Sequence, residues 1–239
     1  MKRVLITGAG RGLGLGFTEQ CLSHGYEVFA GVRNIQKATN LQKITAQNPD
    51  RLTIVDLDVT NFHSIDESYR FISERVNKID LLINNAGVNS KSDGMDNVKS
   101  SQLGQLDAKA MLDIFHVNAI GPIMLAQRYI DLLKAETNSK IINISSDRGS
   151  ITQKDKGGNY SYCASKAALN MLTRTIAFDV IKYKIIAVTI HPGYVKTDMS
   201  LDGSLSPSES AKAILKTVSN LKEEDTGKFL DYNGSVFPW

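Results

Sequence analysis

Short apolar runs alternate along the whole chain with longer segments in which apolar positions recur at a helical spacing. The apolar runs predict strands at Lys2–Thr7, Glu27–Val32, Leu52–Asp56, Leu81–Asn84, Lys140–Ser145, Ile185–His191 and Lys228–Asp231. The segments between them predict helices at Gly12–His24, Ile35–Gln47, Asn61 to about Asn77, Ala108 to about Ala135, Tyr162–Lys182 and, after a cap at Ser206, one last helix. Apolar strands that alternate with helices indicate a parallel sheet covered on both faces.

No linker or internal repeat divides this pattern. Two stretches, Asn89–Leu106 and Ile151–Asn159, are polar and poorly periodic, so we expect them to form surface loops. We therefore predict an α/β chain with a single domain over residues 1–239, folded as a doubly wound (Rossmann) sheet of seven parallel strands.

The composition is that of an ordinary globular protein: of 239 residues, 42% are hydrophobic and 22% are charged, and the net charge is +3. This balance disfavours a disordered chain and a strongly basic nucleic-acid-binding protein. There is no run of 18 apolar residues, and the apolar run after Met1 is too short for a signal peptide, so we predict a cytoplasmic protein without a membrane span. Cys21 and Cys163 are expected to be reduced thiols, and the dispersed histidines predict no metal site.

A glycine-rich turn joins the first predicted strand to the first helix. Its glycines follow a Gly8-xxx-Gly12-x-Gly14 spacing rather than the GxGxxG fingerprint. Glycine lets the backbone turn sharply and approach a ligand, and the free N–H groups of the following helix favour an anion such as a pyrophosphate. A flexible loop could have the same composition, but the place of this turn after the first strand predicts dinucleotide binding.

The residues after the second strand bear on the choice of cofactor. The strand ends in Val32-Arg33-Asn34, without the acidic residue that binds the adenosine ribose of NAD. The guanidinium groups of Arg33 and, in the glycine turn, Arg11 suit the 2′-phosphate of NADP. The alternative is that Arg33 is only a solvated residue at a strand end. We predict NADP(H) as the cofactor.

Tyr162 and Lys166 lie four residues apart, on one face of a predicted helix. Such a pair is often an ordinary surface contact. A neighbouring ammonium group, however, stabilises a phenolate and lowers the tyrosine pKa, and the tyrosine can then exchange a proton with an alcohol or a carbonyl. Ser145 and Ser146 follow at the end of the fifth strand, at the edge where ligands bind, and a hydroxyl there could hold a substrate oxygen.

In this order, the residues resemble the classical short-chain dehydrogenases/reductases, and the resemblance covers essentially the whole chain. The motifs that carry it are Thr7-Gly8-xxx-Gly12-x-Gly14, Asp58-Val59, Asn84-Asn85-Ala86-Gly87, Asn118, Ser146 with Gly149, Tyr162-xxx-Lys166 and Pro192–Thr197. Within that family the chain is most similar to the C-factor/sniffer-like carbonyl reductases, through Thr7–Gly16, His191–Met199 and Asp231–Trp239.

The resemblance implies a catalytic set of Asn118, Ser146, Tyr162 and Lys166. Tyr162 would donate a proton to the carbonyl oxygen, and Ser146, which the offset to Gly149 favours over Ser145, would hold that oxygen. Lys166 would bind the nicotinamide ribose and lower the pKa of Tyr162. Asn118 would bend its helix and hold a water behind Lys166.

The predicted cofactor-binding residues combine these motifs with Arg33. They are Gly8, Arg11, Gly12, Leu13, Gly14, Arg33, Asp58, Val59, Asn85, Ala86, Gly87, Tyr162, Lys166, Pro192, Gly193, Val195 and Thr197. His191, just before Pro192, is expected to be structural.

The predicted function is hydride transfer between NADP(H) and a carbonyl compound or secondary alcohol. The alternative is a cofactor-binding signalling or sensor protein of the C-factor type with little turnover. A sugar-nucleotide epimerase or dehydratase is disfavoured, because too few residues follow Thr197 for a substrate domain. The resemblance also implies a homodimer formed through Ala108–Ala135 and Tyr162–Lys182, and a small-molecule substrate that the sequence does not identify.

Overall fold

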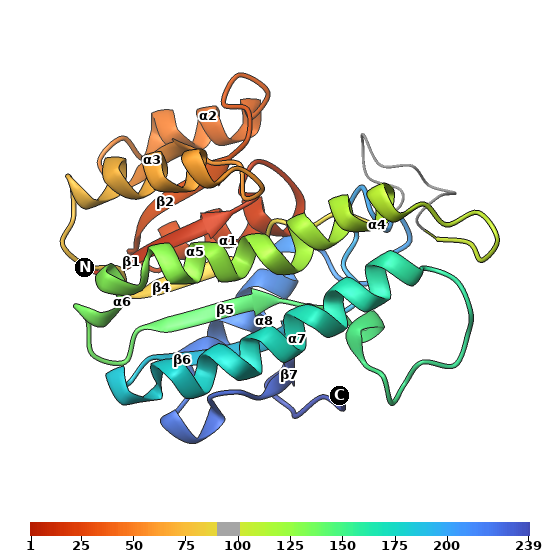
Figure 1. Ribbon diagram of the computed structural model, residues 1–239. Helices are drawn as coiled ribbons and strands as arrows, with labels where there is room; N and C mark the ends of the chain where they lie inside the picture. The colour runs from red at the N-terminus through yellow and green to blue at the C-terminus, as the bar shows by residue number, and fades with distance from the viewer. Residues whose placement is uncertain (90–100) are drawn as a thin grey trace.

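The strands lie side by side in one parallel sheet. The computed structural model describes residues 1–89 and 101–239, and within them the strand order is β3-β2-β1-β4-β5-β6-β7 (Figure 1). The strands are β1 Arg3–Thr7, β2 Glu27–Val32, β3 Leu52–Asp56, β4 Leu81–Asn84, β5 Lys140–Ile144, β6 Ile186–His191 and β7 Phe229–Asp231. All neighbouring strands in this sheet are parallel, so the predicted doubly wound fold with seven parallel strands is confirmed.

Helices connect the successive strands. The α-helices are α1 Gly12–Ser23, α2 Thr39–Gln47, α3 Phe62–Ser73, α4 Ala108–Phe115, α5 Gly121–Arg128, α6 Ile130–Lys134, α7 Tyr160–Val180 and α8 Pro207–Asn220. A π-helical turn, η1 (His116–Ile120), lies between α4 and α5, and a 3₁₀ turn, η2 (Asp147–Gly149), follows β5. In Figure 1, α5 and α7 lie in front of the sheet and α8 lies behind it.

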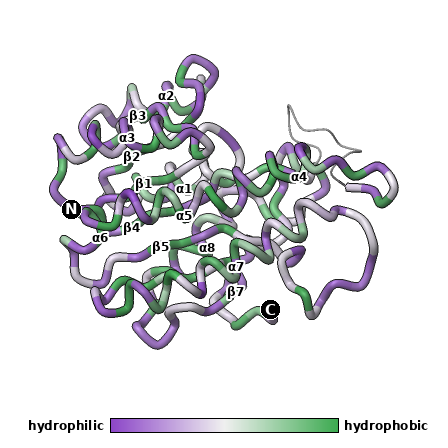
Figure 2. The backbone as a smooth tube through the Cα atoms, viewed as in Figure 1, coloured by the Kyte–Doolittle hydropathy of each residue, from purple (hydrophilic) through white to green (hydrophobic). Residues whose placement is uncertain are grey.

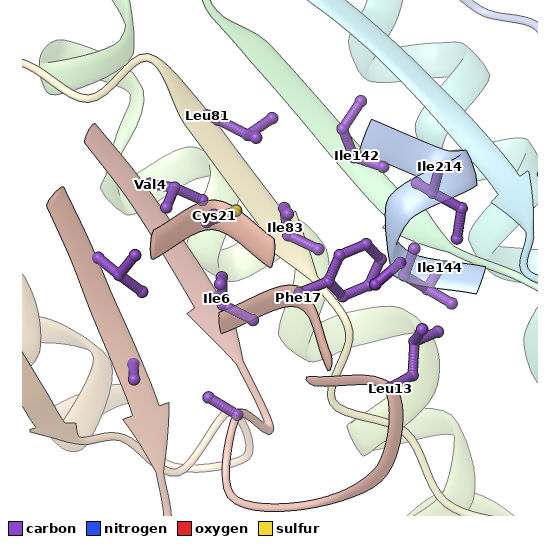
Figure 3. Packing of buried hydrophobic residues seen from close by; sticks show 14 of the residues in the cluster. Val4, Ile6, Leu13, Phe17, Cys21, Leu81, Ile83, Ile142, Ile144 and Ile214 are labelled. Carbon is purple, nitrogen blue, oxygen red and sulfur yellow. The ribbon is translucent and has the colours of Figure 1, made fainter. Parts of the chain in front are cut away.

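Alternate side chains of each strand enter hydrophobic cores on opposite faces of the sheet, as the period of two in a strand requires. Behind the sheet, Val4 and Ile6 of β1 pack with Phe17 and Cys21 of α1 and with Ile214 of α8 (Figure 3). This core places α1 firmly against the strands, so the turn that starts α1 has a fixed position at the sheet edge.

The core in front of the sheet contains the intervening residues. Leu5 of β1 and Leu82 of β4 belong to it, together with Ile72 of α3, Leu125 of α5 and Ala177 of α7. Because both faces are covered, the central strands are largely apolar, which is why their positions were readable from the sequence.

Three predicted helices have different bounds in the structure. The helix predicted from Ile35 begins at Thr39, because Asn34 Oδ1 accepts a hydrogen bond from the Lys37 N–H at 3.0 Å and closes a turn before it. The helix capped at Asn61 is confirmed at its start but ends at Ser73, before the predicted Asn77. Helix α7 begins at Tyr160, two residues earlier than predicted.

The helix predicted from Ala108 to about Ala135 is not continuous. It is interrupted by the π-helical turn around Asn118 and again at Tyr129, whose backbone (φ −91°, ψ 5°) separates α5 from α6. Gly121 follows the π turn, and a Cβ there would lie 2.7 Å from the main-chain oxygen of Val59. The interruption therefore lets α5 approach the loop after β3 closely.

The stretch Ala108–Arg128 is long and apolar enough to cross a membrane by composition alone, and it is the one such stretch in the described residues. Its side chains Ile114, Val117 and Leu125 belong to the core in front of the sheet. Packing on the sheet therefore explains its apolar character. Hydrophilic residues are concentrated in outlying loops such as the one between η2 and α7 (Figure 2), where the predicted loop Ile151–Asn159 is confirmed. The predicted loop Asn89–Leu106 lies largely outside the described residues.

Candidate active site

The carboxyl ends of the central strands meet at one edge of the sheet. The chain order reverses between β1 and β4, and in parallel sheets such a switch point forms the crevice in which ligands bind. Thr7 ends β1, Asn84 ends β4, Ile144 ends β5 and His191 ends β6. Four of the predicted motifs, the glycine turn, Asn84–Gly87, Ser146 with Gly149 and Pro192–Thr197, begin at or just after these strand ends, so the fold brings them to one edge.

The glycine turn after β1 has no room for a side chain at Gly8 or Gly14. Gly8 and Gly12 have positive φ angles of 65° and 52°. A Cβ on Gly8 would lie 3.0 Å from Ala86 Cα, and a Cβ on Gly14 would lie 2.1 Å from the main-chain oxygen of Gly8. The spacing of these glycines therefore has a steric cause, and the surface of the turn is formed by main chain.

Thr7 and Asn85 fasten this turn to the loop after β4. The Thr7 hydroxyl accepts hydrogen bonds from the N–H groups of Asn85, at 3.1 Å, and Ala86, at 3.0 Å. The Asn85 side chain donates in return to the main-chain oxygens of Thr7, at 2.9 Å, and Gly8, at 3.2 Å. Asn85, Ala86 and Gly87 thus lie beside the glycine turn, as predicted.

The N-terminus of α1 fits a phosphate anion. Arg11 is its N-cap residue in an extended conformation, and no side chain caps the helix. The first N–H groups of the helix, at Gly12, Leu13 and Gly14, therefore have no side-chain acceptor and can bind an anion. The segment after β6 reaches the same place, because Thr197 Cγ2 lies 3.3 Å from the position that a Cβ on Gly12 would take.

The two arginines predicted to share a phosphate have different surroundings. Arg11 Nη1 lies 3.0 Å from Asp198 Oδ2, in an exposed ion pair with the segment that follows Thr197. Arg33 is exposed just beyond the end of β2. Arg11 therefore faces an acidic residue in addition to any ligand. The sequence did not predict this ion pair with Asp198.

Asp58 and Val59 form a fixed turn after β3. Asp58 Oδ1 accepts hydrogen bonds from the N–H of Thr60 at 2.9 Å and from its hydroxyl at 2.7 Å. The Asp58 N–H donates to Ser64 Oγ at 2.9 Å. Val59 is buried, with Gly121 of α5 passing against it. This turn lies on the β3 side of the switch point, the side on which the adenine half of a dinucleotide would lie.

Ser145 and Ser146 have distinct partners. The Ser145 hydroxyl is buried and donates to Asn170 Oδ1 of α7 at 2.6 Å. The Ser146 hydroxyl donates to Asp147 Oδ1 at 2.7 Å, accepts from the N–H of Arg148 at 3.1 Å and is hydrogen-bonded to Tyr162. The structure thus places Ser146, and not Ser145, beside the tyrosine. Gly149 allows η2 to pack on α7, since a Cβ there would lie 3.0 Å from Lys166.

Tyr162 and Lys166 lie close together beside the end of β5. Lys166 Nζ donates to the main-chain oxygen of Ile144 at 2.8 Å and lies 5.9 Å from the centre of the Tyr162 ring. Burial raises the pKa of Tyr162 to about 12, against a lowering contribution from the Ser146 hydrogen bond. Burial also lowers the pKa of Lys166 to about 8. Burial therefore outweighs the groups that lower the tyrosine pKa, and the predicted lowering by Lys166 stays a prediction.

Asn118 is buried in the π-helical turn and joins three parts of the site. Its Oδ1 accepts from the Val88 N–H at 2.8 Å, and its Nδ2 donates to the Val88 oxygen at 2.8 Å and to Ser165 Oγ at 3.0 Å. A Cβ on Gly87 would lie 3.4 Å from Asn118 Oδ1 and 3.5 Å from Lys166 Nζ. Asn118 and Lys166 therefore both adjoin Gly87, and the predicted irregularity of the Asn118 helix is present.

The segment Pro192–Thr197 is held across the N-terminus of α8. The main-chain oxygen of Pro192 accepts a hydrogen bond from Ser210 Oγ at 2.6 Å. Gly193 has a φ of 78°, and a Cβ there would lie 2.7 Å from Leu205 Cδ1. Val195 forms a β-bridge with Leu205. These contacts direct the segment back toward the glycine turn.

Two site residues were missed or undervalued in the sequence. Asp147 was not predicted, although it directly follows Ser146 at a strand end. Its N–H donates to His191 Nδ1 at 3.0 Å, so His191 accepts a hydrogen bond from the turn that carries Ser146. Burial lowers the pKa of His191, which favours the neutral form. A carboxylate next to the predicted serine was the available signal.

Comparison with known proteins agrees with this arrangement. Residues 2–205 match the family model described as short chain dehydrogenase. The structure of an NADPH-bound carbonyl reductase from chicken fatty liver is 37% identical, with a TM-score of 0.91 over 100% of this chain and 99% of that chain. The carbonyl reductase Sniffer of D. melanogaster is 32% identical, with a TM-score of 0.91 over 100% of both chains.

A third relative bears on the alternative function. The C-signal of Myxococcus xanthus is 34% identical over 162 residues, which cover 67% of this chain and 93% of that protein. Both the carbonyl reductase and the C-factor sides of the resemblance seen in the sequence are therefore present among the similar proteins.

Proposed function

Because the chain belongs to the short-chain dehydrogenase/reductase family, we propose that it is an NADP(H)-dependent carbonyl reductase, which interconverts a carbonyl compound and the corresponding alcohol. The observation that carries this proposal is the meeting of Ser146, Tyr162 and Lys166 at the end of β5, at the same sheet edge as the glycine-rich turn. The NADPH bound to the chicken carbonyl reductase supports the choice of cofactor.

The cofactor would lie across the switch point between β1 and β4. The N–H groups of Gly12, Leu13 and Gly14 would bind the pyrophosphate, and Arg33, with Arg11, the 2′-phosphate. The remaining contacts would come from residues that follow the ends of β1, β3, β4 and β6, which are Gly8, Asp58, Val59, Asn85, Ala86, Gly87, Pro192, Gly193, Val195 and Thr197. NADPH, when bound, supplies the hydride that adds to the carbonyl carbon.

Tyr162 would complete the reaction as the acid. Its raised pKa means that it holds a proton at neutral pH, as a donor to the carbonyl oxygen must. The hydroxyl of Ser146 would bind the same oxygen and orient it. Once the hydride has added to the carbonyl carbon, the oxygen of that group takes the proton from Tyr162, which gives the alcohol.

Lys166 would supply a fixed positive charge beside the reacting atoms. With a pKa of about 8 it is mostly protonated at neutral pH, and its bond to Ile144 leaves two further N–H donors. These donors suit the hydroxyls of the nicotinamide ribose. Asn118 would hold the loop after β4 against α7, and with it the position of Lys166.

The experiment that tests this function is a panel of reactive carbonyls, including quinones and diones, followed by loss of NADPH absorbance, with NADH assayed alongside. Tyr162→Phe is expected to abolish turnover, whereas Tyr160→Phe, at the start of the same helix, is the matched control. Normal turnover by Tyr162→Phe would overturn the assigned role. NADPH binding without reduction of any panel member would instead support the cofactor-sensing alternative.

A homodimer is part of the proposal. Large apolar side chains are exposed on α7, where Met171 is 65% and Phe178 61% exposed, and around α4 and η1, where Leu112 is 64% and Ile120 42% exposed. Met171 and Phe178 are seven residues apart and share one helix face. A two-fold contact would cover this face in both copies. Light scattering at micromolar concentration tests it, and a monomer would contradict it.

A further inference from the structure

Asp147 receives the only proton of the Ser146 hydroxyl. Ser146 Oγ donates to Asp147 Oδ1 at 2.7 Å. A serine hydroxyl has one proton, so it cannot donate to Asp147 and to a substrate oxygen at the same time. Tyr162 is the other hydroxyl group that interacts with Ser146. The Ser146 hydroxyl thus lies between Tyr162 and a carboxylate.

The Asp147 carboxylate is held in this position. Its main-chain N–H donates to His191 Nδ1 at 3.0 Å, and its Oδ1 also accepts from the N–H of Arg148 at 2.8 Å. His191 in turn packs on Phe237, with 5.2 Å between the ring centres. The Asp147 side chain remains 47% exposed, so a ligand in the site can reach it. The backbone of Asp147 is anchored and its carboxylate is accessible. The carboxylate is therefore a hydrogen-bond acceptor in a fixed position and not a mobile surface charge.

We infer that Asp147 is a positioning residue for Ser146 and that its carboxylate favours α-hydroxy carbonyl substrates and disfavours α-keto carboxylates. This inference rests on the proposed function. The hydroxyl of an α-hydroxy ketone can donate to Asp147, and the proton of Ser146 is then free for the carbonyl oxygen. A plain ketone must break the bond between Ser146 and Asp147 without replacing it. An α-keto carboxylate would bring a second negative charge beside the first.

Charge at Asp147 also acts on the tyrosine. The charged and titratable groups that act on Tyr162 are Asp147 and Cys163, which raise its pKa, and Arg148, which lowers it; Lys166 lies on the same helix. Tyr162 has a pKa of about 12 and Lys166 one of about 8, so a pH profile near neutrality reports on Lys166 and not on this interaction. The different responses of charged and neutral substrates therefore distinguish a positioning carboxylate from a structural one.

The test compares four carbonyls with a shared phenyl ring in wild type, Asp147→Asn and Asp147→Ala. They are phenylpropanedione as a general substrate, acetophenone, α-hydroxyacetophenone and phenylglyoxylate. Wild type is expected to prefer α-hydroxyacetophenone to acetophenone by about tenfold or more in kcat/KM. Asp147→Ala should bring this ratio near one. Asp147→Asn should keep part of it, since an acceptor oxygen remains, but should gain about tenfold on phenylglyoxylate as the charge is lost.

Asp155→Asn, in the exposed loop before α7, is the control for loss of a surface carboxylate. Asp155→Asn should leave the preference for α-hydroxyacetophenone and the rate on phenylglyoxylate at their wild-type values. A hydroxyl preference that survives in Asp147→Ala, or the absence of a gain on phenylglyoxylate in Asp147→Asn, would overturn the inference. Absence of phenylpropanedione reduction by wild type would instead contradict the proposed function itself.

Discussion

The ammonium group of Lys166 donates a hydrogen bond to the main-chain oxygen of Ile144 at 2.8 Å, and thereby joins α7 to the end of β5. Lys166 is only 4% exposed, and burial lowers its pKa to about 8. The protein therefore holds a positive charge where its surroundings disfavour one. Burial of this charge lowers the free energy of unfolding, and the loss can be measured.

Lys166→Met is predicted to be inactive but more stable than wild type at pH 7. At this pH the folded and unfolded chains both carry the lysine proton, so wild type bears the full cost of burying the charge, roughly 1–3 kcal/mol after the bond to Ile144 is allowed for. As pH rises from about 8 toward the ordinary value of 10.5, the folded chain loses the proton first and wild type gains stability. Urea unfolding at pH 7 and at alkaline pH measures this difference, and a pH-independent gap would contradict the argument.

Ser145→Ala and Ser146→Ala are predicted to fail in different ways. Ser145→Ala leaves Asn170 Oδ1 without its buried donor and should cost ~1–3 kcal/mol of stability, with turnover within a few-fold of wild type. Ser146→Ala should lose about 100-fold in kcat/KM, because the substrate oxygen loses a positioned donor, with little change in stability. Thermal melts and steady-state kinetics on both variants measure the two effects. Equal losses of activity in the two variants would contradict the assignment of different roles.

Gly14→Ala is predicted to damage both the fold and cofactor binding. The new Cβ would lie 2.1 Å from the Gly8 oxygen, so the turn must move, at a cost of more than ~2 kcal/mol. Gly157→Ala is the matched control, since nothing lies within 4 Å of its Cβ position. Melting temperature and NADPH titration should change in the first variant and not in the second.

Arg33→Ala is predicted to weaken NADPH binding by about 10- to 100-fold and to leave NADH binding within about twofold, because only NADPH carries the phosphate that a guanidinium group binds bidentately. Lys212→Ala, an exposed cation on α8, controls for the loss of one positive charge. Fluorescence titration gives the affinity of each variant for NADPH and for NADH, and these affinities test the prediction. Equal weakening for NADH would show that Arg33 does not read the phosphate.

The sheet was predicted almost residue for residue, because strands buried on both faces are marked by apolar runs with clear ends. The bounds of β2, β3 and β4 are those expected from the sequence. The glycine spacing and the order of motifs likewise placed the residues of the site at the correct strand ends, from Gly8 to Thr197. Dimerisation and a cytoplasmic location stay predictions.

Tertiary contacts explain what the sequence could not show. An Asx turn at Asn34 displaced the start of α2, and no local pattern distinguishes a π-helical turn from the α-helix around it. Burial raises the pKa of Tyr162, and spacing along the sequence does not reveal burial; the lowering by Lys166 stays a prediction. Asp147 was not predicted because its position is fixed by a hydrogen bond to His191, a residue 44 positions away along the chain.

The π turn at His116–Ile120 separates two tasks along one helical stretch. Ile114 before the turn and Leu125 after it belong to the core in front of the sheet, whereas Asn118 within the turn bonds to Val88 in the loop after β4. The irregular hydrogen bonding is thus confined to the five residues that include the buried polar side chain, and the helices on either side stay regular and pack on the core.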